Sequence, residues 1–302
     1  MTATTGNVEK NKPEPSTLYL VATPIGNAAD LSPRAQKILS ECDFVAAEDT
    51  RNTRKLLGLY GIKKELVSYH DHNRAARGGS ICDRLEAGEC CALVTDAGMP
   101  AVSDPGEDLV RLCAARGISV RVVPGPCAAV SALALSAIST SRFFFEGFLP
   151  VGNTERAARL QQIKRQEATM ILYEAPHKLA HTLRDLARTL GEDRRIALCR
   201  EMTKLNEETL RLSLGEACAY FEQREPRGEF VLVLEGAADY RTRTRAPERE
   251  EEAFLALSPS AHVALYEKEG LPHGDAVKAA AADRGLSKSD FYRLLVQEKE
   301  GS

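Results

Sequence analysis

Short apolar runs alternate with polar segments of helical periodicity along the first half of the chain. The apolar runs at 18–22, 44–47, 90–95 and 120–123 have the length and composition of buried β-strands. Between them, helical spacing of apolar positions covers 34–42, 73–86 and 108–116. Strands that alternate with helices predict a parallel sheet covered on both faces. Ligands bind such sheets beyond the carboxyl ends of the strands.

The alternation continues in a second set of elements. Helices are predicted at 128–137, 154–166 and 178–190, and strands at 143–145, 169–173, 195–200 and 230–235. These elements predict a second α/β domain. We therefore expect a disordered lead (1–16), an N-terminal α/β domain (17–126), a second α/β domain (127–238), a linker (239–252) and a C-terminal helical unit (253–302).

The linker is predicted from a polar stretch without hydrophobic periodicity. Residues 241–245 alternate arginine with threonine, and Pro247 and a glutamate-rich run at 248–252 follow. Three helices are predicted beyond it, at 261–268, 273–283 and 289–297, and the last two with their tight turn suggest a helix-turn-helix. This segment is not markedly basic, so its role could be either packing or dimerisation on the one hand, or nucleic-acid binding on the other.

Composition and charge narrow the classes of protein. The 302 residues are 43% hydrophobic and 27% charged, which is a globular composition. The eight cysteines form no CxxC pair, and no histidine pair stands near them at zinc spacing, so neither a disulfide framework nor a metal site is predicted. Without a signal-like segment or a run of about 20 apolar residues, we expect a cytoplasmic protein outside the membrane. A net charge of -3 offers no bulk attraction to RNA, so RNA binding must rest on local basic patches.

Loops that follow the predicted strands could bind a ligand. Residues 23–27 (TPIGN) match neither GxGxxG nor GxxxxGK[ST], so neither standard nucleotide-phosphate motif is supported. Residues 95–106 contain two aspartates, two glycines and two prolines, a composition that lets backbone groups approach a ligand closely. Together with the Pro-Gly-Pro turn at 124–126, these loops predict a pocket at one edge of the sheet.

The chain also carries a series of ordered motifs: LYLVATPIGNAADLSPRA, AAEDTRNTRKLL, HDHN, LVTDAGMPAVSDPG, VVPGPCAAVSALA, FEGFLP, LYEAPHKL and CREMTKLNEE. In this order they resemble the bacterial family of ribosomal RNA small-subunit 2′-O-methyltransferases, in the tetrapyrrole-methylase superfamily. The resemblance covers about residues 18–236, together with a C-terminal helical unit. It implies a class III methyltransferase fold, in which two α/β domains hold S-adenosylmethionine in the cleft between them, and it implies a homodimer.

The resemblance also implies which residues contact the cofactor. They are Pro24, Gly26, Asp96, Ala97, Gly98, Met99, Val102, Ser103, Cys127, Ala128, Tyr173, Glu174 and Met202. Met99 departs from the family pattern, in which a threonine or another small polar residue is expected. A side-chain hydrogen bond from that position is therefore lost, whereas a backbone contact would survive.

Methyl transfer from a sulfonium is an in-line displacement, which chiefly requires positioning and a route for the hydroxyl proton. No metal is required. The candidate proton acceptors or ribose-orienting groups are Glu48 and Asp49 with Arg51, His70 and Asp71, and Glu201 with Lys204. We expect Asp49 to orient or deprotonate the hydroxyl while Arg51 holds a neighbouring phosphate. For each acidic residue, a loop cap or a salt-bridge partner is the alternative.

Basic side chains in the same motifs could contact phosphates. They are Arg51, Arg54, Lys55, Arg74, Arg77, Lys178, Arg200 and Lys204, for which solvated surface charge is the alternative. Aromatic residues make up only 6% of the chain, so few could stack on a base. The candidates to hold a splayed-out cytidine are Tyr69, Phe145, Phe148 and Tyr173, with core packing as the alternative.

We therefore predict S-adenosylmethionine-dependent 2′-O-methylation of a cytidine ribose in 16S ribosomal RNA, as free RNA or in the assembled small subunit. One alternative is a small-molecule, tetrapyrrole-like methyltransferase on the same fold, because a shared fold does not determine the substrate. Another is a non-catalytic, ribosome-associated binding module. The hydrophilic motifs at 48–51 and 70–73 and the appended helical unit favour RNA over a flat macrocycle.

Overall fold

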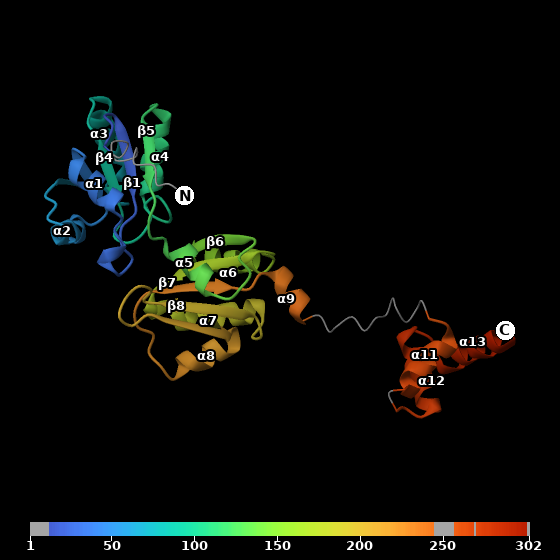
Figure 1. Cartoon of the computed structure of the whole chain (residues 1–302). Helices are drawn as coiled ribbons and strands as arrows, with labels where there is room; N and C mark the ends of the chain where they lie inside the picture. The colour runs from blue at the N-terminus through green and yellow to red at the C-terminus, as the bar shows by residue number, and fades with distance from the viewer. Residues whose placement is uncertain (1–11, 245–256, 269, 301–302) are drawn as a thin grey trace, which may run out of the picture. The chain divides into compact units, whose positions relative to one another are not determined.

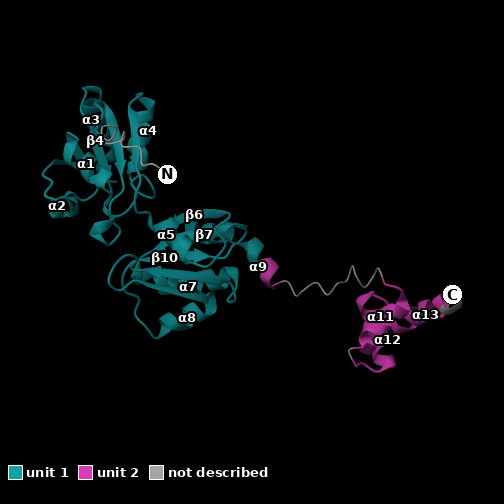
Figure 2. Ribbon diagram, viewed as in Figure 1, with its two compact units in different colours: residues 1–240 teal, residues 241–302 magenta. Residues whose placement is uncertain are grey.

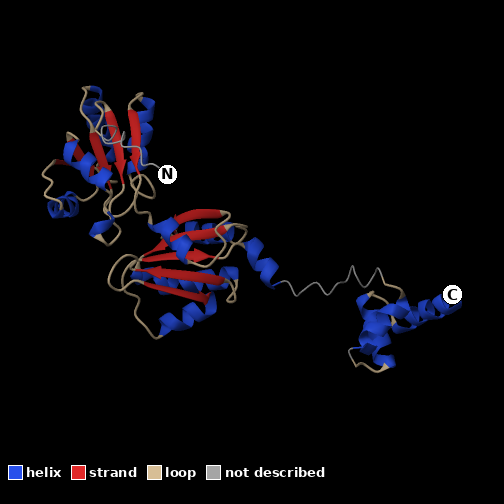
Figure 3. Cartoon of the chain, in the orientation of Figure 1, coloured by secondary structure: helices blue, strands red, loops and turns tan. Residues whose placement is uncertain are grey.

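The computed structural model describes residues 12–244, 257–268 and 270–300. Residues 1–240 form one compact unit, and residues 241–302 belong to a second (Figure 2). All strands of the described residues lie in the first unit, whereas the second contains helices only (Figure 3). Most of the predicted lead and residues 245–252 of the predicted linker lie outside the described residues.

The first sheet, drawn in blue to green in Figure 1, is entirely parallel. Its strand order is β3-β2-β4-β1-β5. Its strands are β1 (Thr17–Val21), β2 (Phe44–Ala47), β3 (Glu65–Ser68), β4 (Cys91–Val94) and β5 (Ser119–Val123). The helices are α1 (Pro33–Glu41), α2 (Thr50–Leu59), α3 (Arg74–Glu86) and α4 (Gly106–Ala115), with a short 3-10 helix at Ala28–Asp30. Alternate strand residues enter two separate cores, one with α1 and α2 and one with α3 and α4. The predicted parallel sheet with helices on both faces is confirmed.

The second sheet is mixed and has the order β6-β7-β10-β8-β9. Its strands are β6 (Phe143–Phe148), β7 (Thr169–Glu174), β8 (Arg195–Arg200), β9 (Glu208–Ser213) and β10 (Phe230–Leu234). Only β6 and β7 pair in parallel, and the other pairs are antiparallel. Helix α5 (Ala128–Leu135) shares one core with this sheet, while α6 (Asn153–Ile163), α7 (Pro176–Leu190) and α8 (Leu214–Glu222) share another. The predicted second α/β layer is therefore present.

Helix α9 (Ala237–Thr244) occupies the first part of the segment predicted to be a linker. The polar composition does not reveal it, because its stabilising contacts come from elsewhere in the chain. The Tyr240 hydroxyl donates to Asp193 Oδ1 at 2.6 Å, and the Arg194 guanidinium lies 4.3 Å from the Tyr240 ring centroid. Residues 239–244 are thus helical, which differs from the expected linker.

The second unit consists of α11 (Pro259–Lys268), α12 (His273–Asp283) and α13 (Lys288–Glu300). The three helices match the predicted ones to within a few residues. Val263, Val277, Ala280 and Phe291 are buried in a small shared core. This arrangement accounts for packing within the unit, and its role in RNA binding or dimerisation stays a prediction.

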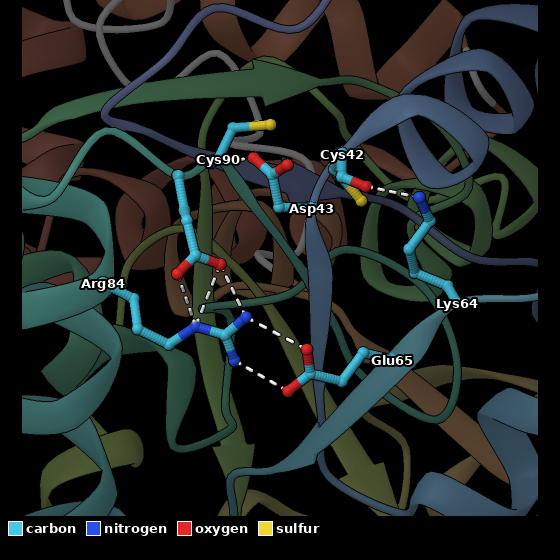
Figure 4. A network of polar contacts seen from close by, with 7 residues as sticks. Cys42, Asp43, Lys64, Glu65, Arg84 and Cys90 are labelled. Atoms are coloured by element: carbon cyan, nitrogen blue, oxygen red, sulfur yellow. Dashed lines mark hydrogen bonds and ion pairs between the residues drawn. The ribbon is translucent and has the colours of Figure 1, made fainter.

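The amino-terminal edge of the first sheet is held together by a polar network (Figure 4). The Arg84 guanidinium donates to both carboxylate oxygens of Glu65, at 2.8 and 3.1 Å, and pairs with Glu89 at 2.6 Å. It also lies 3.6 Å from the centroid of the Phe44 ring. These contacts join α3 to the starts of β2, β3 and β4, at the opposite edge from the loops predicted to bind a ligand.

Candidate active site

Loops from both sheets line one cavity of about 550 Å³. The first sheet contributes Ile25, Glu48, residues 95–99 and residues 102–104, and the start of α5 contributes Cys127 and Ala128. The second sheet contributes Phe148, residues 173–177, Glu201, Met202 and residues 229–231. The predicted pocket at the carboxyl edge of the first sheet is confirmed, and the second sheet closes its other side.

Most of the predicted cofactor residues meet in this cavity. Its lining includes Asp96, Ala97, Gly98, Met99, Val102, Ser103, Cys127, Ala128, Tyr173, Glu174 and Met202. Pro24 and Gly26 are not in the lining. A Cβ atom on Gly26 would lie 2.5 Å from Lys204 Cγ and 3.0 Å from the Met202 carbonyl oxygen. Gly26 therefore allows the loop after β1 to pack against the loop after β8, which is a packing role rather than a place in the cavity wall.

The loop at 95–106 has a tightly specified backbone. The Asp104 carboxylate accepts hydrogen bonds from the backbone N–H groups of Ala101 at 3.0 Å, Val102 at 3.2 Å and Gly106 at 2.8 Å. Ala101 and Ser103 have φ angles of 66° and 68°, in the left-handed region that costs non-glycine residues about 1–2 kcal/mol each. The Asp104 hydrogen bonds offset this cost. Asp104, whose role could not be predicted from the sequence, thus fixes the backbone of this part of the cavity wall.

On the second sheet, a buried network anchors Glu174. Glu174 Oε2 accepts from the Thr182 hydroxyl at 2.5 Å, and Oε1 accepts from the Ala175 N–H at 2.9 Å. The Thr182 hydroxyl in turn accepts from Arg156 Nη2 at 2.8 Å, and Arg156 Nε donates to Asp185 at 2.8 Å. Because both carboxylate oxygens are already bonded, Glu174 is held in one orientation in the cavity wall.

The aromatic residues proposed to stack on a base lie either in the wall of the cavity or in the hydrophobic core. The Tyr173 ring makes edge contacts with Phe145 and Phe148, at centroid distances of 5.2 and 5.6 Å. Phe148 and Tyr173 line the cavity, and Phe148 is 57% exposed. Tyr69 is only 2% exposed and packs between α3 and α4, so the core alternative holds for it.

Asp49, the preferred proton acceptor of the sequence analysis, caps helix α2. Its Oδ1 accepts from the backbone N–H groups of Arg51 at 2.7 Å and Asn52 at 3.4 Å. These hydrogen bonds, the first from Arg51, hold the pKa of the Asp49 carboxyl below its ordinary value. Asp49 does not line the cavity. Asp49 therefore acts as a helix cap, and its position outside the cavity argues against a role as a base.

Glu201 lines the cavity but is held in an ion pair. Its Oε1 accepts from Lys204 Nζ at 2.9 Å and from the Glu229 N–H at 3.0 Å. The bond from Lys204, followed by that from the Glu229 backbone, lowers the pKa of the Glu201 carboxyl. The φ angle of Glu201 is 50°, so the backbone is constrained here as well. Glu201 is better suited to fixing the loop than to accepting a proton.

His70 and Asp71 lie outside the cavity lining. The backbone N–H of His70 donates to Asn73 Oδ1 at 2.9 Å, and its ring Nε2 faces Asn73 Nδ2 at 3.3 Å. Asp71 lies 3.5 Å from Arg74 Nη1. Both side chains therefore serve the turn that leads into α3.

Glu48 is placed differently from its neighbour Asp49. It lines the cavity, where Oε2 accepts from the Thr95 hydroxyl at 3.0 Å. Burial raises the pKa of the Glu48 carboxyl, and the negative charges of Asp96, Asp104 and Asp71 raise it further, while the Thr95 hydrogen bond lowers it. Glu48 and Asp49 belong to the same sequence motif, and only the structure shows that Glu48 lines the cavity whereas Asp49 does not.

The basic candidates fall into two groups. Arg74 pairs with Asp108 at 2.6 Å, and Lys204 pairs with Glu201 at 2.9 Å and Glu229 at 2.8 Å, so carboxylates neutralise both cations. The second group lies on α2, where Arg51, Arg54 and Lys55 line a shallow surface hollow. The Arg51 side chain is 83% exposed and its contact with Asp49 is long, at 3.5 Å. Lys178, at the start of α7, is also exposed.

Two further observations concern metals and membranes. The described residues contain no cluster of three or more histidine, cysteine, aspartate or glutamate side chains suited to a metal ion. In the same part of the chain, none of the helices has the length and apolar character needed to cross a membrane.

Comparison with known proteins places the chain among methyltransferases. Residues 17–218 match the family described as Tetrapyrrole (Corrin/Porphyrin) Methylases. A relative from Halalkalibacterium halodurans, named ribosomal RNA small subunit methyltransferase I, is 44% identical over 289 residues, covering 96% of this chain and 98% of its own. A relative of the same name from Escherichia coli O157:H7 is 38% identical and covers 93% of this chain and 95% of its own. The relative of that name from Thermotoga maritima is 45% identical over 219 residues, covering 72% of this chain and 98% of its own.

Solved structures support the same fold. Diphthine synthase superposes with a TM-score of 0.56 at 14% identity, covering 72% of this chain and 90% of its own. Uroporphyrin-III C-methyltransferase from Thermus thermophilus, in complex with S-adenyl homocysteine, superposes with a TM-score of 0.53 at 18% identity. That comparison covers 74% of this chain and 99% of the other. At these identities the structures establish the fold alone.

Proposed function

Since the chain belongs to the tetrapyrrole methylase family, and within it to the ribosomal RNA small subunit methyltransferase I group, we propose that it methylates small-subunit ribosomal RNA. The donor is S-adenosylmethionine and the acceptor is the 2′-hydroxyl of a cytidine in 16S RNA. The observation that carries this proposal is the cavity, in which the family's cofactor loops from both sheets meet. The proposal places the reaction in the cytoplasm.

The cavity fits the proposed cofactor in size and charge. Its volume of about 550 Å³ lies within the range of small-molecule sites, which is roughly 300–1,000 Å³. Small residues such as Ala97, Gly98 and Ala128 leave room beside the loops, and Glu48 and Asp96 supply negative charge. When bound, S-adenosylmethionine supplies an electrophilic methyl group on a sulfonium, and a negatively charged wall stabilises that cation.

The exposed basic face of α2 is the proposed contact for the RNA backbone. Arg51, Arg54 and Lys55 lie on the helix that begins directly after Glu48 and Asp49, so a phosphate held there would lie near the cavity entrance. Lys178 follows the cavity residues Pro176 and His177 and adds a positive charge from the second sheet. Since the net charge is -3, this local surface rather than the whole protein must attract phosphates. Dimerisation and RNA binding by the second unit remain part of the proposal as predictions.

Mass spectrometry of ribosomal RNA nucleosides tests the proposal directly. Small subunits and protein-free 16S RNA from cells lacking the gene are incubated with the full chain and isotopically labelled S-adenosylmethionine. Labelled 2′-O-methylcytidine is the expected product, and comparison of the two substrates shows whether assembly is required. No label in RNA from either substrate would contradict the proposal.

A further inference from the structure

We infer that Glu48 is the catalytic residue that accepts the proton of the ribose 2′-hydroxyl, and that Thr95 is its positioning residue. This inference rests on the proposed function and identifies the chemical step within the same site. Glu48 takes the role that the sequence led us to expect for its neighbour Asp49. Among the buried and half-buried carboxylates around the cavity, Glu48 accepts the fewest hydrogen bonds, which leaves an oxygen that is available to a substrate.

The local geometry explains why adjacent residues differ. Strand β2 ends at Ala47, and Ala47 is in register with Val94 of β4, so Glu48 and Thr95 leave neighbouring strands side by side. The Thr95 hydroxyl donates to Glu48 Oε2 at 3.0 Å and so restrains the carboxylate. Within the described part of the chain, Glu48 Oε1 has no hydrogen-bond donor, which leaves one oxygen for a substrate hydroxyl.

The other carboxylates of the cavity region are either held by more donors or exposed to solvent. Asp96 accepts one hydrogen bond, from Asn52 Nδ2 at 3.1 Å, but it is exposed, whereas Glu48 is half-buried. Asp49 caps α2, and Glu201 receives hydrogen bonds from Lys204 and a backbone N–H. Glu174 has both oxygens bonded, and Asp104 accepts three backbone N–H groups. A carboxylate that must break such bonds to accept a proton is a weaker base than one that does not.

The charges that act on Glu48 come from two neighbouring loops. Asp96 and Asp104 belong to the loop after β4, and Asp71 belongs to the loop after β3. With burial, these negative charges raise the pKa of Glu48, while the Thr95 hydroxyl opposes the increase. A carboxyl with a raised pKa takes up a proton more readily.

The ribose oxygen forms a bond to the methyl carbon while the carbon–sulfur bond breaks, and the electron pair of that bond stays on sulfur as a neutral thioether. The hydroxyl proton passes to Glu48 Oε1, so the carboxylate becomes a neutral carboxylic acid. Release of that proton to solvent restores Glu48, and the products are the 2′-O-methyl ribose and S-adenosylhomocysteine.

Glu48→Gln tests the inference with little change in shape. In single-turnover methylation of small subunits, the variant should lose roughly 10²–10⁴-fold in rate, the usual contribution of a general base. The affinities for S-adenosylhomocysteine and for the subunit should each stay within about threefold, which separates lost chemistry from lost binding. A rate within about threefold of the wild type, or a rate loss matched by lost affinity, would overturn the assignment.

Two companion variants sharpen the test. Asp49→Asn keeps a capping side chain and should lose much less rate than Glu48→Gln, whereas the reverse order would return the role to Asp49. Thr95→Val removes the hydrogen bond that lowers the Glu48 pKa, so the acidic limb of the pH–rate profile should move to higher pH, and Thr95→Ser should restore it. An unmoved limb would overturn the positioning role. If the wild type itself transfers no methyl group, the proposed function fails and this inference falls with it, whereas an active Glu48→Gln overturns this inference alone.

Discussion

Replacing Gly26 with alanine should open the cavity although Gly26 itself is not in the cavity lining. The new Cβ would lie 2.5 Å from Lys204 Cγ, 2.7 Å from Thr203 Oγ1 and 3.0 Å from the Met202 carbonyl oxygen. Ordinary contacts begin near 3.4 Å, so the two loops must separate by several tenths of an ångström. The lysine stem cannot simply swing away, because ion pairs hold its ammonium group. Overpacking of this kind costs about 1–3 kcal/mol.

That cost can appear in either of two measurements. If the loops stay closed, the free energy of unfolding falls, and the melting midpoint drops by about 2–4 °C per kcal/mol. If the loops open, the cofactor must close them again, and its affinity falls by about 5- to 150-fold for the same 1–3 kcal/mol. Thermal unfolding and calorimetric titration with S-adenosylhomocysteine together capture both outcomes.

Gly58→Ala is the matched control for the same chemical change. Gly58 lies in α2, and a Cβ there meets no atom within 4 Å. Alanine in place of a helical glycine should raise the free energy of unfolding by about 0.5–1 kcal/mol and leave cofactor affinity unchanged. If Gly26→Ala matched the wild type in both stability and affinity, the close packing of the two loops would be refuted.

Arg54→Ala should reduce the slope of log affinity against log salt for RNA binding by about 0.7–0.9, the value for one phosphate contact. Lys204→Met, the control, should leave that slope unchanged. Both slopes can be measured by filter binding over a salt series, and a larger effect of Lys204→Met would contradict the prediction. Arg84→Met should lower the free energy of unfolding by only about 1 kcal/mol, because its ion pairs are partly exposed. Arg84 lowers the pKa of Glu65 in the folded protein, so the stability from this ion pair is present above the pKa that Glu65 has in the unfolded chain. It is lost as the pH falls through the folded-state pKa of Glu65. In denaturant unfolding, the difference in stability between the wild type and Arg84→Met should therefore be smaller at about pH 3 than at neutral pH. Truncation after Thr244 should preserve cofactor affinity, because all the described residues that line the cavity precede Thr244. A loss of affinity above about fivefold in calorimetry would contradict this prediction.

Short-range patterns in the sequence predicted most of the first sheet. Its central strands are fully apolar because helices cover both faces, so four of its five strands stand out as apolar runs. Strand β3 and helix α2 escaped prediction because their burial is partial. The mixed pairing of the second sheet was also beyond the sequence pattern, since strand direction depends on how the connections fold back.

The ordered motifs likewise determined the family, and most of the residues that they nominate for cofactor binding line one cavity. Tertiary structure decided which charged groups in those motifs are available. Asp49 and Glu48 are adjacent, but α2 begins at Thr50, so backbone N–H groups of this helix donate to the Asp49 carboxylate. The Glu48 carboxylate lines the cavity instead. Lys204 is neutralised by Glu229, a partner that the sequence does not place beside it. A motif specifies residue types at short spacing, whereas basicity and free charge depend on hydrogen-bond donors and counter-ions brought in by distant segments.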